Sequence, residues 1–278
     1  MKNFGGLKMK KLLGTSLLAG TLLFNTATTT AAAPAPAQEK ETIYQVALLQ
    51  SLAMGYFDGS ISVKDLKTYG DTGIGTFEGL NGEMIVLDGV VYRANQNCKI
   101  NVMGDKETVP FSNVTFFEKD FSVKLRDVHD KAALEKILNE LVDKHGRNSF
   151  YMVKIPADFN EVLVRSESGQ EEPYPTLVEA LKTQNEITPK NIRGTIVGLY
   201  CPDFMSSLNS VGWHFHFISS DKKIGGHVLE LDIKSGEAQF DKTDNFNMGL
   251  PAKKNFHELN FKKDLREDIR KAEQDSQR

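Results

Sequence analysis

Cysteine, tryptophan and long apolar runs are scarce in this sequence. The 278 residues include two cysteines and one tryptophan. Cys98 and Cys201 are too few for a disulfide scaffold, and the sequence leaves open whether they form a bridge or two buried thiols. The apolar run from Leu12 to Phe24 is shorter than the roughly 20 residues that span a membrane, and no longer run follows it. The mature protein is therefore expected to be soluble.

Several sequence marks of common enzyme classes are also missing. The chain has no Gly-x-Ser-x-Gly segment, no glycine-rich phosphate motif and no internal repeat. These absences argue against a serine hydrolase of the α/β type, a P-loop nucleotide-binding protein and a repeat array. Hydrophobic residues make up 40% of the chain and aromatic residues 9%, which allows a substantial core in one large domain or two small ones.

The first 37 residues have the composition of an export signal. Four lysines precede the apolar run, and a segment rich in threonine and alanine follows it. This order of basic, apolar and small residues is typical of a secretory signal peptide. We expect residues 1–37 to be the signal and processing region, residues 38–43 to be a disordered leader, and the protein to be secreted or extracytoplasmic.

Removal of that region changes the charge of the chain. The full sequence has a formal net charge of −3, and residues 1–37 hold four lysines and no acidic residue, so the remainder has a charge of −7. An acidic exported protein has little electrostatic attraction for nucleic acid or an anionic membrane. A small molecule is the expected partner.

Apolar periodicity predicts more strands than helices. Helices are expected over Tyr44–Met54, Asp130–His145, Leu177–Gln184 and Leu265–Gln274. Strands are expected over Phe150–Ile155, Val162–Arg165, Ile192–Tyr200, Trp213–Ser219 and His227–Ile233, and Met84–Arg93 is expected to form a hairpin. The strands do not alternate regularly with the helices, so the predicted class is α+β with largely antiparallel or mixed sheets.

Prolines between residues 173 and 189 interrupt the pattern of predicted elements. They indicate an N-terminal α/β part over residues 44–175 and a C-terminal β-rich part over residues 176–278. The same prolines are compatible with a long connection inside one domain. The boundary is therefore an expectation with an open alternative.

Three of the six histidines fall within 14 residues. His214 and His216 are two apart in a predicted strand and therefore point to the same face, while the aromatic residues between and beside them point to the other. A polar turn follows, and the returning strand brings His227 opposite His216 or His214. Three converging imidazoles with an open position suit a catalytic zinc ion. The alternative is that the histidines are structural, as a lone His-x-His usually is.

The histidine hairpin, together with three further segments in a fixed order, resembles the α-acetolactate decarboxylase family from about Tyr44 to the C-terminus. The supporting segments are Gly75 to Ile85, Arg165, and the Pro173-Tyr174-Pro175 sequence that follows it. The resemblance implies a two-part α/β fold, a homodimer and a divalent metal ion, zinc by the family pattern, held by His214, His216 and His227. It also implies that Thr76, Glu83, Arg165 and Glu273 complete the active centre.

The activity implied by this resemblance is decarboxylation of 2-acetolactate (2-hydroxy-2-methyl-3-oxobutanoate) to acetoin and carbon dioxide. The metal would stabilise an enediolate intermediate. Arg165 would bind the substrate carboxylate, because a guanidinium can donate two parallel hydrogen bonds to a carboxylate. Glu83 is the first candidate for the proton donor, with Glu273 as its partner or as an occasional metal ligand.

Two other functions compete with this prediction. Cupins also place His-x-His on a strand, which allows a metal-dependent oxygenase or isomerase, but the glutamate that cupins commonly place a few residues later is missing after Ile218. A secreted module that binds metal without catalysis is the other alternative. The tail is a further open point, because the charged segment around Glu273 is typical of a solvated helix, whereas the resemblance implies that it folds back to the metal.

Overall fold

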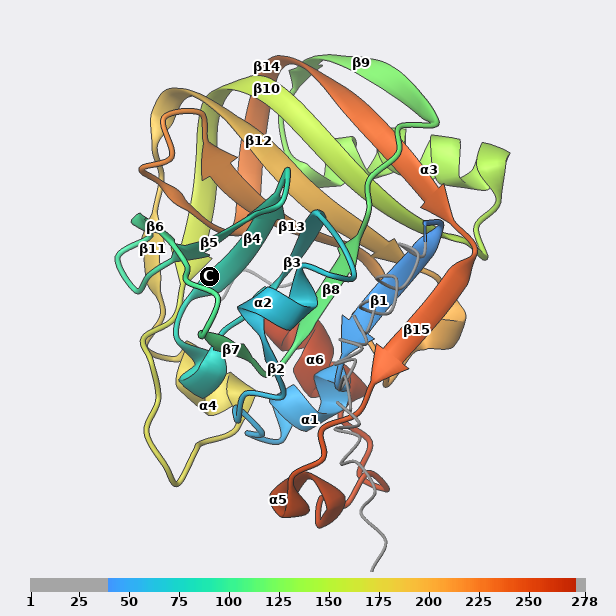
Figure 1. The fold of residues 1–278 in the computed structure, drawn as a ribbon. Helices are drawn as coiled ribbons and strands as arrows, with labels where there is room; N and C mark the ends of the chain where they lie inside the picture. Colours follow the sequence, from blue (N-terminus) through green and yellow to red (C-terminus); the bar gives the residue numbers. More distant parts are fainter. Residues whose placement is uncertain (1–39, 274–278) are drawn as a thin grey trace, which may run out of the picture. The chain divides into compact units, whose positions relative to one another are not determined.

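Two β-sheets pack against each other in the computed structural model, which describes residues 40–273 (Figure 1). A seven-stranded sheet has the strand order β15-β1-β8-β3-β4-β5-β6, and a six-stranded sheet has the order β11-β10-β12-β13-β14-β9. Apart from the parallel pair β1 and β15, all pairings are antiparallel. The α+β class with largely antiparallel sheets is confirmed.

The strands of the seven-stranded sheet are short. They are β1 (Thr42–Val46), β3 (Thr72–Thr76), β4 (Glu83–Leu87), β5 (Val90–Ala94), β6 (Ile100–Val102), β8 (Ser112–Thr115) and β15 (Asn245–Gly249). A separate pair joins β2 (Ile61–Ser62) to β7 (Thr108–Val109). The predicted hairpin over Met84–Arg93 is confirmed as β4 and β5, and its turn residues Asp88 and Gly89 both have positive φ angles, as a type I′ turn requires.

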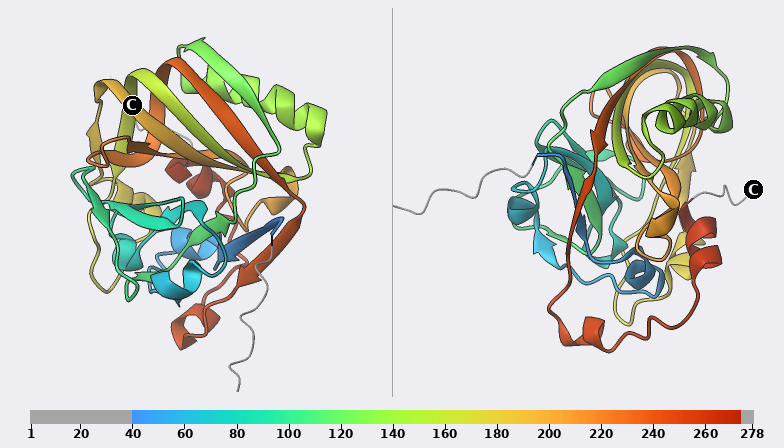
Figure 2. Two further views of the ribbon diagram at one scale, coloured as in Figure 1. Left: turned by 45° about the horizontal axis from the view of Figure 1, so that its top comes forward. Right: turned by 90° about the vertical axis from the view of Figure 1, so that its right-hand side faces the viewer.

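The six-stranded sheet curves until two of its strands meet. Its strands are β9 (Phe121–Val128), β10 (Phe150–Ser166), β11 (Asn185–Ile187), β12 (Lys190–Cys201), β13 (Gly212–Ser219) and β14 (Gly225–Thr243). Because β10 pairs with both β12 and β14, the strands β10, β12, β13 and β14 form a closed ring, seen in the right-hand view of Figure 2. β9 and β10 precede the expected boundary at residue 175 and pair with strands that follow it.

Long strand β10 differs from its prediction. The sequence predicts two strands, Phe150–Ile155 and Val162–Arg165, but β10 runs without interruption from Phe150 to Ser166. Its pairing with β14 shifts register at three places. Such bulges bend a strand and increase its twist, which closing a small ring requires. The apparent break in the sequence is the part of the strand that curves.

The helices lie around the sheets. They are α1 (Leu49–Ala53), α2 (Val63–Leu66), α3 (Lys131–His145), α4 (Leu177–Leu181), α5 (Lys254–His257) and α6 (Arg266–Glu273), with 3-10 turns η1 (Glu78–Leu80) and η2 (Asp203–Met205). In α3 the Asp130 side chain accepts a hydrogen bond from the Ala133 N–H at 2.6 Å and so caps the start of the helix. No helix within residues 40–273 is long and apolar enough to span a membrane. The expected signal region lies outside the described residues.

The first predicted helix, Tyr44–Met54, is wrong in its N-terminal half. Residues 42–46 form β1, and only Leu49–Ala53 are helical. All five residues of β1 are buried, because Ile43 packs toward the second sheet while Tyr44 and Val46 pack on the opposite side. A strand that is buried on both faces shows no alternation of apolar and polar residues, so the spacing of apolar residues in β1 resembles that of a helix.

Cys98 and Cys201 are both buried and free. They belong to different clusters of the core, and the open question of a bridge is resolved in favour of two thiols. Burial raises the pKa of the Cys98 thiol to about 12. The thiol form is therefore the one present near neutral pH.

Candidate active site

The hairpin of β13 and β14 places the three histidines together. His216 lies directly opposite His227 in the register of the two strands, and His214 projects from the same face two residues earlier. A Cβ atom at Gly226 would lie 2.4 Å from the backbone oxygen of Arg165, so this glycine lets β14 approach β10 closely beside the histidines. The sequence-based prediction of a histidine hairpin is confirmed.

Ring nitrogens of the three histidines converge. His214 Nε2 lies 3.1 Å from His216 Nε2 and 3.0 Å from His227 Nδ1. All three residues are buried. The His216 Nδ1–H donates a hydrogen bond to the backbone oxygen of Met84 at 2.7 Å, which leaves a lone pair on Nε2, the nitrogen that faces the other rings.

The surroundings keep these imidazoles uncharged. Burial, followed by the positive charge of Arg165 among other neighbours, lowers the pKa of His227 well below its usual range. Burial and then the neighbouring His216 lower the pKa of His214 in the same way. Burial lowers the pKa of His216 to about 4, although its hydrogen bond to Met84 acts in the opposite direction. Neutral imidazole is the form that binds a metal ion.

The three imidazoles fit a divalent cation. Their ligand nitrogens lie within 4.8 Å of one another. His227 Nε2 is buried and has no hydrogen-bond partner among residues 40–273. Neutral imidazole nitrogens that converge in this way can bind one cation through their lone pairs, at about 2.0 to 2.1 Å from each nitrogen for zinc. Three nitrogen donors match the preferences of zinc and related transition metals.

Two carboxyl groups approach the histidines from different elements. Glu83 opens β4, and its Oε2 lies 3.3 Å from His216 Nε2. Glu273 ends the described part of α6, and its Oε2 lies 3.3 Å from His214 Nε2. Burial raises the pKa of Glu273 to about 7, against the opposing charge of Arg165. Burial also raises the pKa of Glu83 well above its usual range.

The C-terminal tail folds back to this site. Ile269 and Ala272 of α6 are buried against α1 and α4, in a cluster that also contains Leu265. The Arg165 Nη2–H donates a hydrogen bond to the backbone oxygen of Ala272 at 2.5 Å. The charged segment that resembles a solvated helix therefore has one buried face, and Arg165 fixes its end.

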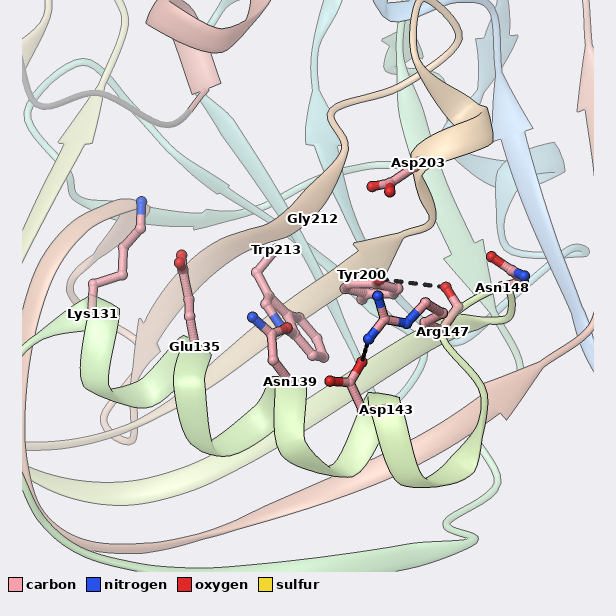
Figure 3. A pocket seen from close by; sticks show the side chains of 10 residues that line it. All are labelled: Lys131, Glu135, Asn139, Asp143, Arg147, Asn148, Tyr200, Asp203, Gly212 and Trp213. Carbon is pink, nitrogen blue, oxygen red and sulfur yellow. Dashed lines mark hydrogen bonds and ion pairs between the residues drawn. The ribbon is translucent and has the colours of Figure 1, made fainter.

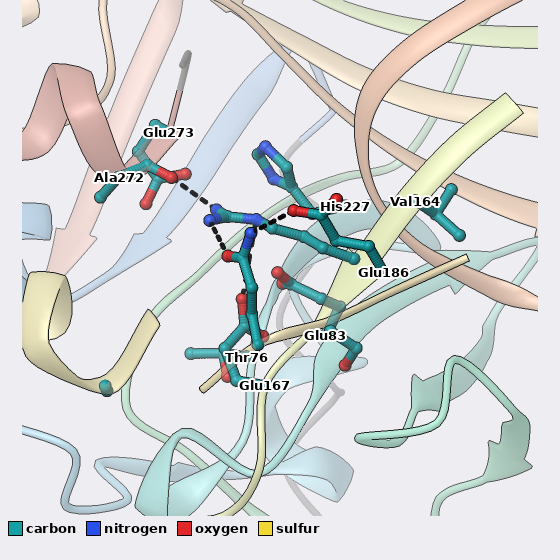
Figure 4. A network of polar contacts seen from close by, with 12 residues as sticks. Thr76, Glu83, Val164, Glu167, Glu186, His227, Ala272 and Glu273 are labelled. Atoms are coloured by element: carbon teal, nitrogen blue, oxygen red, sulfur yellow. Dashed lines mark hydrogen bonds and ion pairs between the residues drawn. The ribbon is translucent and has the colours of Figure 1, made fainter. Parts of the chain in front are cut away.

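Among the described residues that line the cavity, Arg165 is the only cation. Figure 4 shows Thr76, Glu83 and Glu273 in the same network. Arg165 is buried near the end of β10, and its Nη1–H donates to Gln184 Oε1 at 2.9 Å. The Thr76 hydroxyl donates to the backbone oxygen of Gly82 at 2.9 Å, which fixes the turn that leads into Glu83. All seven residues predicted for the site thus belong to one group.

Apolar side chains form the walls of the cavity that these polar groups enter. The cavity contains Thr76, Glu83, Arg165, His214 and Glu273, and its apolar lining residues are Leu52, Leu80, Phe111, Leu177 and Leu181. A larger pocket of about 570 Å³ runs along α3 (Figure 3). Polar and charged side chains line much of that pocket, but none of the three histidines does. The smaller cavity is therefore the candidate site.

Two residues of the network were missed in the sequence. Glu167 is buried, lines the cavity, and its negative charge is the largest cause after burial of the raised pKa of Glu83. It lies two residues after Arg165, so the spacing that revealed His214 and His216 could have indicated it. Gln184 follows α4 in a connection, and no local signal links it to Arg165.

A sequence model of the α-acetolactate decarboxylase family matches residues 43–263. This span contains Thr76, Glu83, Arg165 and the three histidines, and it stops before α6. Glu273 is therefore placed by the structure and lies outside the matched span.

Individual relatives agree with this match. The α-acetolactate decarboxylase of Methanosarcina mazei is 38% identical over 233 residues, which cover 84% of this chain and 80% of that protein. The one from Bacillus subtilis strain 168 is 34% identical over 237 residues, with 85% and 92% covered. The crystal structure of α-acetolactate decarboxylase from that strain superposes with a TM-score of 0.81 over 84% of this chain and 99% of the other, at 34% identity. The chain belongs to the α-acetolactate decarboxylase family, whose members are carboxy-lyases.

Proposed function

We propose that this protein decarboxylates 2-acetolactate to acetoin and carbon dioxide in a metal-dependent reaction. The observation that supports this best is the arrangement of three neutral imidazoles, two carboxyl groups and one buried guanidinium around a single cavity. The named activity of the relatives gives the substrate. A module that only binds metal does not need a buried arginine and two buried carboxyls beside the histidines.

His214, His216 and His227 would hold the cation, and zinc is the proposed metal. When bound, a divalent cation supplies a Lewis acid that stabilises negative charge on the ketone oxygen of the substrate. The protein's part is to keep the imidazoles neutral and oriented. Burial keeps them neutral, and the Met84 backbone oxygen orients His216.

Arg165 is proposed to bind the substrate carboxylate. The bond between this carboxylate and the adjacent carbon breaks, carbon dioxide leaves, and the electron pair moves toward the neighbouring ketone to give an enediolate. A proton must then reach the carbon that lost the carboxylate, giving acetoin. Glu83 is the proposed donor, because burial and the nearby charge of Glu167 raise the pKa of its carboxyl and so favour the protonated form that a donor needs. The apolar walls limit the access of water to this proton transfer.

Loading and removing metal should switch the activity. Zinc-loaded protein should release carbon dioxide and form acetoin from racemic acetolactate, because the imidazole group then has its cation. Protein dialysed against a chelator should lose this activity and regain it when zinc is added back. The measurements are metal content, carbon dioxide release and acetoin formation. Metal-loaded protein that releases no carbon dioxide, while a known decarboxylase does so in parallel, would exclude the proposal.

Arg165→Lys tests the carboxylate anchor. Lysine keeps the charge but lacks the planar fork that can hold Gln184, Ala272 and a carboxylate together. Activity should fall by about one to two orders of magnitude, since each charge-assisted hydrogen bond contributes about 1.5 to 3 kcal/mol. The measurement is kcat/KM for acetolactate.

A matched control for this substitution is Arg193→Lys. Arg193 lies on β12, and its exposed side chain pairs with Asp158 at 2.7 Å. It does not line the candidate cavity. The control should keep the kinetic constants of the unmodified protein. Unchanged catalytic efficiency in Arg165→Lys itself would show that the guanidinium fork is not used.

A further inference from the structure

Glu167 is a third buried carboxyl in the candidate active site. It follows β10 directly, and only 3% of its side chain is exposed. It lines the same cavity as Thr76, Glu83 and Arg165, and Figure 4 shows it beside Thr76. Burying a carboxylate is costly unless a partner offsets the loss of hydration. A partner for Glu167 is therefore expected nearby.

That partner is Arg165. Glu167 Oε1 lies 3.8 Å from Arg165 Nε, and this is the only ion pair that Arg165 makes within residues 40–273. The other two guanidinium nitrogens donate to neutral oxygens, those of Gln184 and Ala272. Glu167 thus faces the one edge of the guanidinium that no hydrogen bond fixes.

The Nε edge of Arg165 makes no hydrogen bond. Arg165 Nε is buried without a hydrogen-bond partner in the described part of the chain, and so is Oε2, the carboxyl oxygen of Glu167 that is not part of the 3.8 Å contact. A separation of 3.8 Å is too long for a hydrogen bond, although it is within the range of an ion pair. A small movement of either side chain would bring the two groups within hydrogen-bond distance.

We propose that Glu167 is a positioning residue that pairs with the Nε edge of Arg165 and turns the remaining Nη–H groups toward the carboxylate of the substrate. This rests on the proposed role of Arg165 as the carboxylate anchor. Glu167 touches no part of the substrate in this arrangement and acts through Arg165. Its contribution is orientation, which raises the fraction of bound substrate that is held correctly.

The test is a double-mutant cycle on kcat/KM for acetolactate, measured with the full-length, metal-loaded protein. Glu167→Ala should lower kcat/KM by about ten- to a hundredfold, mainly by raising KM, since an oriented charge-assisted contact is lost. Arg165→Lys should cause a loss of similar size. The double variant should be no more than about threefold worse than Arg165→Lys alone, because residues that act through one another are not additive.

Controls separate positioning from a general structural role. Glu161 lies on strand β10, which Glu167 follows, and it pairs with Lys190 near the surface. Glu161→Gln should keep the kinetics of the unmodified protein. Bound metal should stay stoichiometric in every variant. Glu167→Gln retains an oxygen that can accept a hydrogen bond from Arg165 Nε, so its kcat/KM should lie between those of Glu167→Ala and the unmodified protein. If Glu167→Ala does not fold, Glu167→Gln takes its place in the cycle.

Three outcomes would overturn the proposal. Additive losses in the double variant would mean that Glu167 acts by a route separate from Arg165. Unchanged kinetics in both Glu167 variants would mean that Glu167 has no part in catalysis. If Arg165→Lys were impaired in the same experiment, the proposed role of Arg165 as the carboxylate anchor would still stand. Full activity in Arg165→Lys would contradict both the proposed role of Arg165 as the carboxylate anchor and the proposed role of Glu167.

Discussion

Replacing His216 with alanine should remove most of the bound metal and lower turnover by at least about a hundredfold. His216 is the histidine with the best-defined orientation, because its Nδ1–H is bonded to Met84 and its Nε2 faces the other rings. Loss of groups that only orient a ligand already costs about 10- to 100-fold in metal affinity or activity, so loss of a ligand itself should cost more. Metal content and acetoin formation measure the two effects.

His257→Ala provides the matched control. His257 is exposed on α5 and is not one of the grouped ligands. This variant should keep its metal and its activity. Stoichiometric metal together with turnover close to that of the unmodified protein in His216→Ala would contradict the hairpin site.

Changes to Glu273 and to the end of α6 should have the second largest effect on turnover. Glu273→Gln keeps the shape of the side chain and removes only its ionisable group, which lies 3.3 Å from His214 Nε2. We expect kcat to fall by about a hundredfold, which is within the range for a group that takes part in proton transfer. Truncation after Lys271 should lower kcat at least as much, because it also removes the Ala272 oxygen that accepts from Arg165.

Glu267→Gln separates the carboxyl group from the helix that presents it. Glu267 belongs to the exposed face of α6, where it pairs with Arg270, and its replacement should leave kcat unchanged. Metal content should be retained in all of these variants, since the three histidines lie on β13 and β14. Full activity in both Glu273→Gln and the truncated protein would leave Glu83 as the acidic candidate.

The histidine site could be predicted because its information is local. Two histidines two residues apart share a face of a strand, and a short turn fixes where the third returns. Helix α3 was predicted for the same reason, since its cap, apolar stripe and terminal glycine all lie within 17 residues. Patterns of this kind need no knowledge of the rest of the fold.

The arginine network depends on contacts that no local pattern contains. Arg165 binds Gln184, 19 residues away, and Ala272, 107 residues away. The position of Glu273 was expected from family resemblance alone, because the sequence of α6 has the charge pattern of a solvated helix. Strand β1 was mistaken for a helix because burial on both faces removes the alternation that marks a strand.

The order in which the chain leaves the ribosome determines when the site can exist. Strand β1 near the beginning of the described chain pairs with β15 near its end, and Glu273 lies in the last described helix. Domains fold from the N-terminus as synthesis proceeds, but here one edge of β1 and one side of the cavity are completed only by residues 245–273. A nascent chain therefore contains the complete histidine hairpin before it contains Glu273 and the β15 partner of β1.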